Sequence, residues 1–514
     1  MTTELLEREQ KYEAAFNATI PPLDDLPRVA TVSVPKVGTL TAQYYDTDDF
    51  RLLGAGITLR HRAGGTDAGW HLKLPAAAGR REIQRLGDSP GEPVPAEPVP
   101  GELERLVRAY TRGAALRPVA RIETRRRLTI LRDASGKSLA EVAADEVAAQ
   151  TLGTTTTVSR WNEIEVELTG GGPELLRAAD KRLRHGGLRP AGYSAKLERA
   201  LGDGLERPRP RRPGRASPGR NSSAGEVVLA YLDKYTARLK SLDSAVRRDQ
   251  PDAVHQMRVT TRRLRSTLQA FPDVLPGRGA ARLRAELKWL GGVLGGARDN
   301  EVLTEQLSTW LASLPAELVM GPAQARLRVH FAPREAQARE AVLAALDSER
   351  YVALLDELER FLDEPPRTGQ AAQPATDVLP AAVGRSFRRT RRRMRHARRV
   401  PAGPARDVAL HEVRKAAKRA RYAAEAAEPV YGKQARRFAR RMKQVQSVLG
   451  DHQDAVTART AAREIGVHAH MAGENAFTFG LLLERANRDA AEYRHQARKA
   501  WQRAARRKYR AWLG

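Results

Sequence analysis

Up to about residue 200, apolar and polar positions alternate with a period of two, which is typical of half-buried β-strands. The clearest segments are GITLRHR (56–62), IETRRRLTI (122–130) and NEIEVELTG (162–170), and turns rich in Gly, Pro, Asp or Ser separate such segments. Helical patterns are few in this part of the chain. We therefore expect a closed or nearly closed antiparallel sheet.

From residue 223 the apolar period lengthens to about 3.6, which indicates amphipathic helices. The segment HQMRVTTRRLR at His255 realigns on HEVRKAAKRAR at His411, and LKWLGGVLGGARD realigns on MKQVQSVLGDHQD at nearly the same offset. Two blocks that recur in the same order predict a tandem duplication. We expect two helical bundles related by a pseudo-two-fold axis.

Residues 202–222 are dense in Pro, Arg, Gly and Ser and have no apolar period, so we interpret them as a linker. This linker divides the chain into an N-terminal domain at 2–201 and a helical domain at 223–512. A second break within the helical domain places the two repeats at about 223–363 and 378–512. The expected fold class is α+β and multidomain.

Charge is distributed unevenly over the 514 residues, whose formal net charge is +28. Residues 1–200 contain 29 basic and 27 acidic residues, whereas the rest of the chain contains 60 and 34. A polycationic half attracts polyanions such as nucleic acid, an anionic membrane surface or a polymeric phosphate. Nucleic acid is the weaker candidate, because aromatic residues make up only 5% of the chain and no known nucleic-acid-binding motif occurs. We expect it to bind only non-specifically, at low salt.

The composition also excludes several classes of protein. The chain has no cysteine, which excludes disulfide scaffolds, thiolate metal sites and cysteine nucleophiles. No apolar run reaches the roughly 18 residues of a membrane span, and the charged start MTTELLEREQ is unlike a signal peptide. We expect a soluble, cytoplasmic protein with no membrane partner.

Charged residues gather on one side of several predicted strands. The sets that share a side are Glu7, Glu9 and Lys11; Arg60 and Arg62; Arg80 and Glu82; and Glu163, Glu165 and Glu167. For a single strand, a solvated face is the simpler interpretation. Several such strands favour an inward-facing lumen, in which carboxylates would bind Mg²⁺ or Mn²⁺ and basic groups would bind phosphate.

This ordered series of charges resembles the CYTH family, the triphosphate tunnel metalloenzymes, over roughly residues 2–201. The Glu-x-Glu-x-Lys motif opens the series at Glu7. The later members are Arg60, Arg62, Lys73, Arg80, Glu82, Arg125 to Arg127, Asp145, Glu163, Glu165 and Lys196. The resemblance implies an eight-stranded antiparallel tunnel that hydrolyses inorganic triphosphate, a short polyphosphate or an organic triphosphate with Mg²⁺ or Mn²⁺.

The resemblance also implies roles for these residues. The catalytic set that contacts phosphate or orients the reactants is Glu7, Glu9, Lys11, Arg60, Arg62, Lys73, Arg80, Glu82, Arg125, Arg127 and Lys196. The metal ligands would be Glu7, Glu9, Asp145, Glu163 and Glu165. Arg125 and Arg127 are preferred over Arg126 because they share parity with Thr129. Few residues after Arg80 could recognise a nucleoside or thiamine ring, which favours an inorganic chain as substrate.

Each repeat of the helical half carries a basic stripe along one helix face. The two stripes are His255, Arg258, Arg262 and Arg265 in the first repeat and His411, Arg414, Lys418 and Arg421 in the second. Solvated arginine faces are the alternative, and we prefer that interpretation for residues 386–399, where cations occupy every side of the helix. For the two stripes, their repetition favours a shared basic groove or pore.

The stripes and the blocks that follow them resemble the CHAD domain over about residues 223–512. The resemblance implies two four-helix bundles that bind inorganic polyphosphate in a central basic channel. That channel would be lined by the two stripes together with Lys288 and Lys443, while Asp299 and Asp454 look structural. Because the helical half has no carboxylate cluster for a catalytic metal, we interpret it as a binding module.

Two functions are consistent with these features. In the first, the tunnel is a triphosphatase-type phosphohydrolase and the helical half binds long-chain polyphosphate. In the alternative, the whole chain is a non-catalytic polyphosphate-binding protein that targets polyphosphate granules. The intact Glu-x-Glu-x-Lys and Glu-x-Glu faces favour the first.

Overall fold

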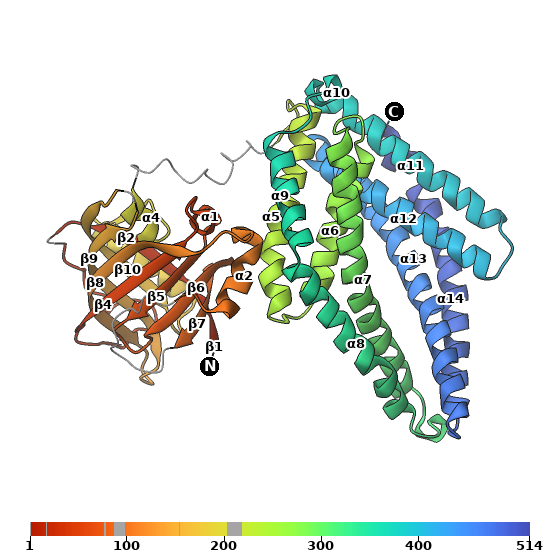
Figure 1. Cartoon of the computed structure of the whole chain (residues 1–514), viewed down its shortest axis with the longest axis horizontal. Helices are drawn as coiled ribbons and strands as arrows, with labels where there is room; N and C mark the ends of the chain where they lie inside the picture. The colour runs from red at the N-terminus through yellow and green to blue at the C-terminus, as the bar shows by residue number, and fades with distance from the viewer. Residues whose placement is uncertain are drawn as a thin grey trace. The chain divides into compact units, whose positions relative to one another are not determined.

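The computed structural model describes residues 2–16, 18–76, 79–86, 98–153, 155–202 and 218–513. It divides into two compact units, Met1–Pro213 and Gly214–Gly514, the first built on a sheet and the second on helices (Figure 1). The boundary between them falls within the predicted linker, of which residues 203–217 lie outside the described part of the chain. The predicted α+β architecture, an antiparallel sheet followed by helices, is confirmed.

The strands of the first unit form one antiparallel sheet in the order β1-β7-β6-β5-β4-β8-β9-β10-β2-β11, with β3 beside β8. Their bounds are β1 (Thr2–Glu7), β2 (Glu9–Ala14), β3 (Thr31–Val32), β4 (Lys36–Asp46), β5 (Thr58–Ala63), β6 (Gly69–Ala76), β7 (Gly79–Leu86), β8 (Arg117–Arg132), β9 (Ser138–Thr151), β10 (Val158–Leu168) and β11 (Arg189–Pro190).

The start of the chain closes this sheet on itself. β1 pairs with β7, β2 pairs with β10, and only Arg8 separates β1 from β2. The carbonyl of Arg8 still accepts a hydrogen bond from the Leu168 backbone N–H at 2.9 Å. A Cβ on Gly79 (φ +114°) would lie 2.1 Å from the Glu7 carbonyl oxygen, so only glycine fits at this junction. Counted as one bent strand, β1–β2 together with β4 to β10 gives the eight strands expected.

Four helices accompany the sheet: α1 (Arg51–Gly54), α2 (Gly101–Thr111), α3 (Pro173–His185) and α4 (Lys196–Leu201). α3 covers part of the outer face, where its Leu175, Ala179 and Leu183 pack with residues of β2, β9 and β10. α4 instead packs on apolar residues of β4, β8, β9 and β10, through Leu197 and Leu201. This packing fixes Lys196, the first residue of α4, against the inner face.

The second unit is helical throughout its described elements. Its longer helices are α5 (Ala224–Arg247), α6 (Ala253–Ala270), α7 (Arg278–Ala312), α8 (Ala323–Asp347), α9 (Glu349–Asp363), α11 (Ala375–Arg399), α12 (Pro404–Ala426), α13 (Glu428–Met471) and α14 (Phe477–Ala504). The short helices are α10 (Gly369–Ala372) and α15 (Arg507–Arg510). α5 begins with a capping box between Ser223 and Glu226.

Matching helices of the two repeats meet in this unit. α7 runs beside α8 and α13 beside α14 (Figure 1), and these four helices share one apolar cluster that includes Leu307, Phe331, Ile465 and Phe479. α6 packs against α12, so the helices that carry the two predicted stripes are neighbours.

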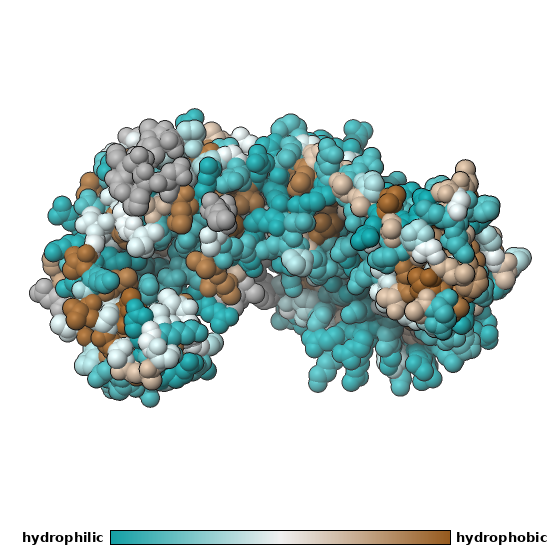
Figure 2. All heavy atoms as spheres, turned by 90° about the horizontal axis from the view of Figure 1, so that it is seen from below, coloured by the Kyte–Doolittle hydropathy of each residue, from teal (hydrophilic) through white to brown (hydrophobic). Residues whose placement is uncertain are grey.

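The hydropathy of the surface agrees with the amphipathic helix pattern of the sequence. Figure 2 shows that hydrophilic side chains cover most of the visible face of the helical unit. Within the described residues, no helix is both long enough and apolar enough to cross a membrane.

Candidate functional site

Strand register brings the predicted charged residues of the first unit onto one face of the curled sheet. Lys11 lies opposite Glu165, Lys73 opposite Glu82, and Arg126 opposite Asp145. The other face of the same strands carries apolar residues such as Tyr12 and Ile164, which pack against α3. The charged face is therefore the inner one, as expected for a lumen.

A first group of inner carboxylates consists of Glu7, Glu9 and Glu167, whose oxygens lie within 4.8 Å of one another. Glu7 is 4% exposed and its Oε1 pairs with Lys73, whereas its Oε2 is buried without a hydrogen-bond partner. The second member of this group, Glu9, has its Oε2 3.0 Å from Lys11 Nζ. Burial, together with repulsion by Glu7 and Glu9, raises the pKa of Glu167 to about 7. These carboxylates fit a divalent cation, which prefers oxygen ligands and would offset the repulsion.

A second group, Asp145, Glu163 and Glu165, already has protein cations among its oxygens. Lys196 Nζ lies 2.9, 2.6 and 2.7 Å from these three carboxylates in that order. Arg126 adds two hydrogen bonds to Asp145, at 2.9 and 2.7 Å, and one to Glu165 at 2.9 Å. Burial opposes ionisation, but Lys196 and Arg126 outweigh it and hold the pKa of Asp145 below its usual value. Protein cations thus offset the negative charge of this second group more fully than they offset the charge of the first group.

The two inner arginines of β5 differ in how far their charge is offset. Arg60 donates to Tyr44 Oη at 3.2 Å and lies 3.9 Å from Glu82, and these neighbours raise the pKa of Arg60 although burial opposes its charge. Arg62 pairs with Asp67. Burial, with repulsion from Arg60 and Arg126, lowers the pKa of Arg62 to about 9. Because arginine keeps its proton in proteins, this shift measures an unfavourable free energy that a bound anion would relieve.

Two predicted residues, Glu82 and Arg80, are held by their neighbours. Glu82 accepts from Gln84 at 2.8 Å and lies 3.0 Å from His71 Nδ1. His71 Nε2 lies 2.7 Å from the Asp67 carbonyl oxygen, to which it can only donate. Arg80 donates to the Gly56 carbonyl at 2.9 Å. These contacts position Glu82 beside Lys73 and tie Arg80 to the backbone.

The preference for Arg125 and Arg127 as inner residues is wrong. Arg125 is exposed and pairs with Glu146 at 3.6 Å, and Arg127 is exposed as well. The inner parity of β8 is set by the buried Ile122 and Thr124, which continue to Arg126. Parity with the half-buried Thr129 was a poor guide, because Thr129 lies on the outer face, where Leu131 of the same parity is buried in the cluster under α3.

The list of predicted site residues omitted three inner-face residues: His71, Arg126 and Glu167. The sequence had already placed Glu167 on the same side of its strand as Glu163 and Glu165, and alternation could also have indicated His71, which shares parity with Lys73. No sequence signal singled out Arg126 within its run of three arginines.

In the helical unit, the two stripes face each other where α6 packs on α12. Burial and repulsion from Arg414, Arg262 and Arg258 hold the pKa of Lys418 well below its usual value. Arg262, in the matching place of the first repeat, has its pKa lowered by burial, and Arg258 and Arg414 add repulsion. These stripe residues therefore lie close together, and the acidic groups around them do not fully offset their positive charge.

Two glycines give the stripe arginines room. A Cβ on Gly295 of α7 would lie 3.6 Å from Arg258 Nη2, and one on Gly450 of α13 would lie 3.2 Å from Arg414 Nη2. Arg258 also donates to Asp299 at 2.8 Å. The repeated Leu-Gly pair of the sequence thus lets each guanidinium lie flat against the next helix.

The stripe histidines differ in their partners. His411 Nδ1 lies 2.9 Å from Gln453 Oε1, and His255 faces Arg298, which occupies the place of Gln453 in the first repeat. Burial, with the neighbouring cations, lowers the pKa of both histidines below its usual value. Both are therefore neutral near pH 7 and can donate a hydrogen bond without carrying charge.

The outer members of the predicted channel are less enclosed. Arg421 donates to Glu425 at 2.6 Å and to Gln446 at 3.2 Å, whereas Arg265 Nε is buried without a hydrogen-bond partner. Lys288 and Lys443 are exposed on α7 and α13.

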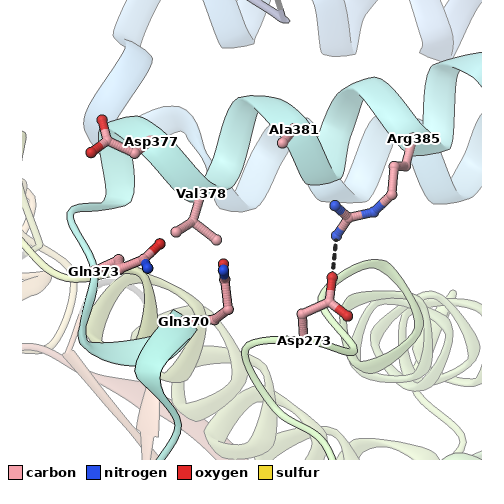
Figure 3. Close-up of a pocket in the computed structure, with 7 residues that line it drawn as sticks. All are labelled: Asp273, Gln370, Gln373, Asp377, Val378, Ala381 and Arg385. Carbon is pink, nitrogen blue, oxygen red and sulfur yellow. Dashed lines mark hydrogen bonds and ion pairs between the residues drawn. The ribbon is translucent and has the colours of Figure 1, made fainter.

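A polar pocket of about 500 Å³ lies elsewhere in the helical unit (Figure 3). Asp273, after α6, pairs with Arg385 of α11 at 2.7 Å across it, and Gln370 and Gln373 flank the opening. It contains none of the predicted binding residues. Its ion pair ties the turn after α6 to α11.

The chain matches two family models in succession. A CYTH domain matches residues 6–191 and a CHAD domain matches residues 230–463. A relative from Mycobacterium tuberculosis strain H37Rv, the uncharacterized protein Rv2226, is 36% identical over 93% of this chain and 92% of its own length.

Two solved structures resemble the chain over about half of its length. PptA from Streptomyces chartreusis aligns with 55% of this chain and 100% of its own, at a TM-score of 0.47 and 24% identity. The CHAD domain of the plant Ricinus communis aligns with 58% of this chain and 93% of its own, at a TM-score of 0.40 and 24% identity.

Proposed function

The chain belongs to the CYTH family in its N-terminal unit and to the CHAD family in its helical unit, and on this premise we propose that it is a metal-dependent phosphohydrolase that docks on polyphosphate. The tunnel, at residues 2–201, hydrolyses inorganic triphosphate or another short chain with Mg²⁺ or Mn²⁺. The helical domain, at 223–512, binds long-chain inorganic polyphosphate, and residues 202–222 join the two.

One contrast on the inner face carries the catalytic part of this proposal. Glu7 Oε2 is buried without a hydrogen-bond partner, and the pKa of Glu167 is raised although Lys73 and Lys11 lie among these carboxylates, so their negative charge is only partly offset. On the same face, the pKa of Arg62 is lowered although it pairs with Asp67, so its positive charge is only partly offset. A phosphate chain with its divalent cation supplies both further charges at once.

Glu7, Glu9 and Glu167 would hold the cation, which when bound neutralises phosphate charge and aligns the attacking water. The neutralised group around Lys196 has a different role. Lys196 and Arg126 keep Glu165 ionised next to Lys11, so Lys11, Lys196 and Arg126 present fixed positive charge to the phosphate oxygens. Preorganised charge of this kind is the main contribution that a protein makes to phosphoryl transfer.

An inorganic substrate suits the described inner face. Two of its aromatic residues, Trp161 and Tyr44, are buried, with the Arg199 guanidinium over the Trp161 ring at 5.0 Å from the centroid and Arg60 against Tyr44. Neither offers a free ring for stacking on a nucleobase or on thiamine. We therefore expect tripolyphosphate to be a better substrate than a nucleoside triphosphate.

Phosphate release from tripolyphosphate, with Mg²⁺ and then Mn²⁺, tests the catalytic part. Glu7→Gln and Glu9→Gln keep the shape of each side chain but remove a metal ligand, and we expect each to lose at least about 100-fold in kcat/KM. Glu146→Gln removes an exposed outer carboxylate and is the matched control, with activity unchanged. Metal-dependent release that persists in both inner variants would overturn the proposal.

Absence of release from any triphosphate would leave the alternative, a polyphosphate-binding protein. Binding is measured separately by titrating long-chain polyphosphate into wild type and into Arg262→Gln, whose side chain lies at the centre of the facing stripes. We expect weaker binding by about tenfold or more in the variant. Equal binding would reject the stripes as the polymer site.

A further inference from the structure

The pseudo-two-fold axis between α6 and α12 relates two cross-repeat contacts that differ in charge. On one side Arg263 of α6 pairs with Glu425 of α12. On the other, Arg419 of α12 donates to Gln269 of α6 at 2.7 Å. Arg263 matches Arg419, and Glu425 matches Gln269, at the same offset as the histidine stripes. One arginine is thus paired with a carboxylate, and its counterpart faces only an amide.

Further contacts widen this difference. Arg263 also donates to Tyr235 Oη at 2.6 Å and to Tyr231 Oη at 3.2 Å, both on α5. When the sequences of α5 and α11 are aligned by their buried positions, Val227 matches Val378. In this alignment Tyr231 and Tyr235 match Ala382 and Ser386. The environment of Arg419 therefore lacks the two tyrosine hydroxyl groups as well as the carboxylate.

Positive charge accumulates around Arg419 instead. Burial, followed by repulsion from Arg389, Arg265 and Arg284, lowers the pKa of Arg419 to about 10. Its Nε is buried without a hydrogen-bond partner. Glu412, an acidic group that acts on Arg419, is itself paired with Lys415 at 2.7 Å.

The basic surface continues along α11. Arg389, Arg392, Arg393 and His396 line a hollow of about 320 Å³, and within the described residues none of these arginines has an ion-pair partner. The sequence alone favoured a solvated face for residues 386–399, and Arg389, Arg392 and Arg393 are exposed in the structure. Arg389 also acts on Arg419, so this exposed face lies beside it.

We propose that Arg419 and the α11 residues Arg389, Arg392 and Arg393 form a second phosphate-binding site, which takes the part of a long polyphosphate chain that extends beyond the facing stripes. This inference rests on the proposed function of the helical domain. Arg265 is a stripe residue and also acts on Arg419, so the two basic regions meet there. Glu412, a carboxylate that acts on both Arg419 and Arg393, is paired with Lys415. A guanidinium suits phosphate because it donates two parallel hydrogen bonds.

The first test restores the missing carboxylate. Gln269→Glu copies Glu425, which pairs with Arg263 and also with the stripe residue Arg421. The new carboxylate would therefore neutralise Arg419 and would also act on Arg265, the stripe residue that matches Arg421, without removing any basic residue. We expect binding of long-chain polyphosphate to weaken by about tenfold at low salt, and binding of a short oligophosphate to the stripes to weaken by less. Unchanged long-chain binding in a folded variant would overturn the site.

The second test removes charge from α11. The triple variant Arg389→Gln, Arg392→Gln and Arg393→Gln is compared with a control of equal charge change, Arg328→Gln, Arg463→Gln and Arg488→Gln, all exposed and unpaired among described residues. We expect only the α11 variant to lose long-chain affinity and to show a shallower salt dependence. Equal losses of affinity in both triple variants would mean that net charge alone determines binding, and would overturn the proposed site.

These outcomes separate the two proposals. If wild type does not bind even the short oligophosphate, the proposed function of the helical domain fails. If short chains bind to every variant and long chains are unaffected by the α11 and Gln269 changes, only the second site fails. Loss of duplex DNA binding in the α11 variant, with polyphosphate binding intact, would assign the surface to nucleic acid and overturn the proposal.

Discussion

Glu167 differs from the carboxylates beside it in having no ion-pair partner among the described residues. Lys73 pairs with Glu7 and Lys11 with Glu9, whereas burial of Glu167 and repulsion from Glu7, Glu9 and Glu82 outweigh its attraction to Lys73. Alternation along β10 correctly predicted that Glu163, Glu165 and Glu167 share a face. It could not predict which of them is uncompensated, since Lys196 and Arg126 come from distant elements.

This residue predicts a pH dependence. A carboxyl group whose pKa rises from 4.5 to about 7 on folding binds more protons in the folded state, so stability falls as pH rises between these values. Without metal, Glu167→Gln should therefore stabilise the protein by up to about 3 kcal/mol at pH 8, with little effect at pH 4.5. Urea denaturation in chelator at both pH values measures this, with Glu146→Gln as control.

A stabilisation of equal size at both pH values would contradict the raised pKa of Glu167. The same titration governs metal binding, because the cation competes with a proton for this carboxylate. Below pH 7 the apparent metal affinity should fall by up to about tenfold per pH unit through this group.

At the scale of elements, helix faces and strand faces were predicted with different success. The block alignment identified the stripes of α6 and α12 and the Leu-Gly pairs of α7 and α13, because duplicated helices keep their spacing. The β8 strand was misread at Arg125 and Arg127, since a run of three arginines has no periodicity of its own. Pairing across repeats, such as Arg263 with Glu425, required the packing of α6 on α12.

The two glycines under the stripe arginines give a matched pair of tests. Gly450→Ala would place a Cβ 3.2 Å from Arg414 Nη2, so the guanidinium must shift, whereas Gly295→Ala makes an ordinary contact of 3.6 Å with Arg258. Both should stabilise their helices by about 0.5–1 kcal/mol. Only Gly450→Ala should weaken polyphosphate binding, by about threefold.

Thermal unfolding and polyphosphate titration of the two variants check this prediction. Equal binding by both would mean that Arg414 reaches phosphate from its shifted position as well as from its original one. Equal weakening by both would mean that close approach of the helix backbone, rather than the guanidinium, determines binding.

At the scale of the whole molecule, two units on one chain can hold one polymer. If the helical domain binds long-chain polyphosphate, the linker raises the local concentration of chain ends near the tunnel. The composition of residues 202–222 was sufficient to predict a linker, but no sequence pattern reports the reach that it gives. The effect belongs to neither unit alone.

Cleavage at a protease site introduced between residues 203 and 217 tests this coupling. We expect KM for long-chain polyphosphate to rise at least about tenfold after cleavage, because tethering is lost, with hydrolysis of tripolyphosphate unchanged. The uncleaved variant is the control for the insertion. Equal KM values before and after cleavage would show that the units act independently.

The bent strand at Arg8 has a consequence for how the protein is made. Residues 2–14 precede both of their partners in the chain, and the second partner, β10, begins only at Val158. During synthesis β1 can pair as soon as β7 has emerged, whereas β2 must wait for β10 until more than half of the first unit has emerged. Until then the edge strands β7 and β10 cannot both be paired, and an unpaired edge strand can pair with another chain. Glu7 and Glu9 therefore come together with Glu167 only at the moment when the barrel closes, so a nascent or misassembled sheet cannot hold the metal.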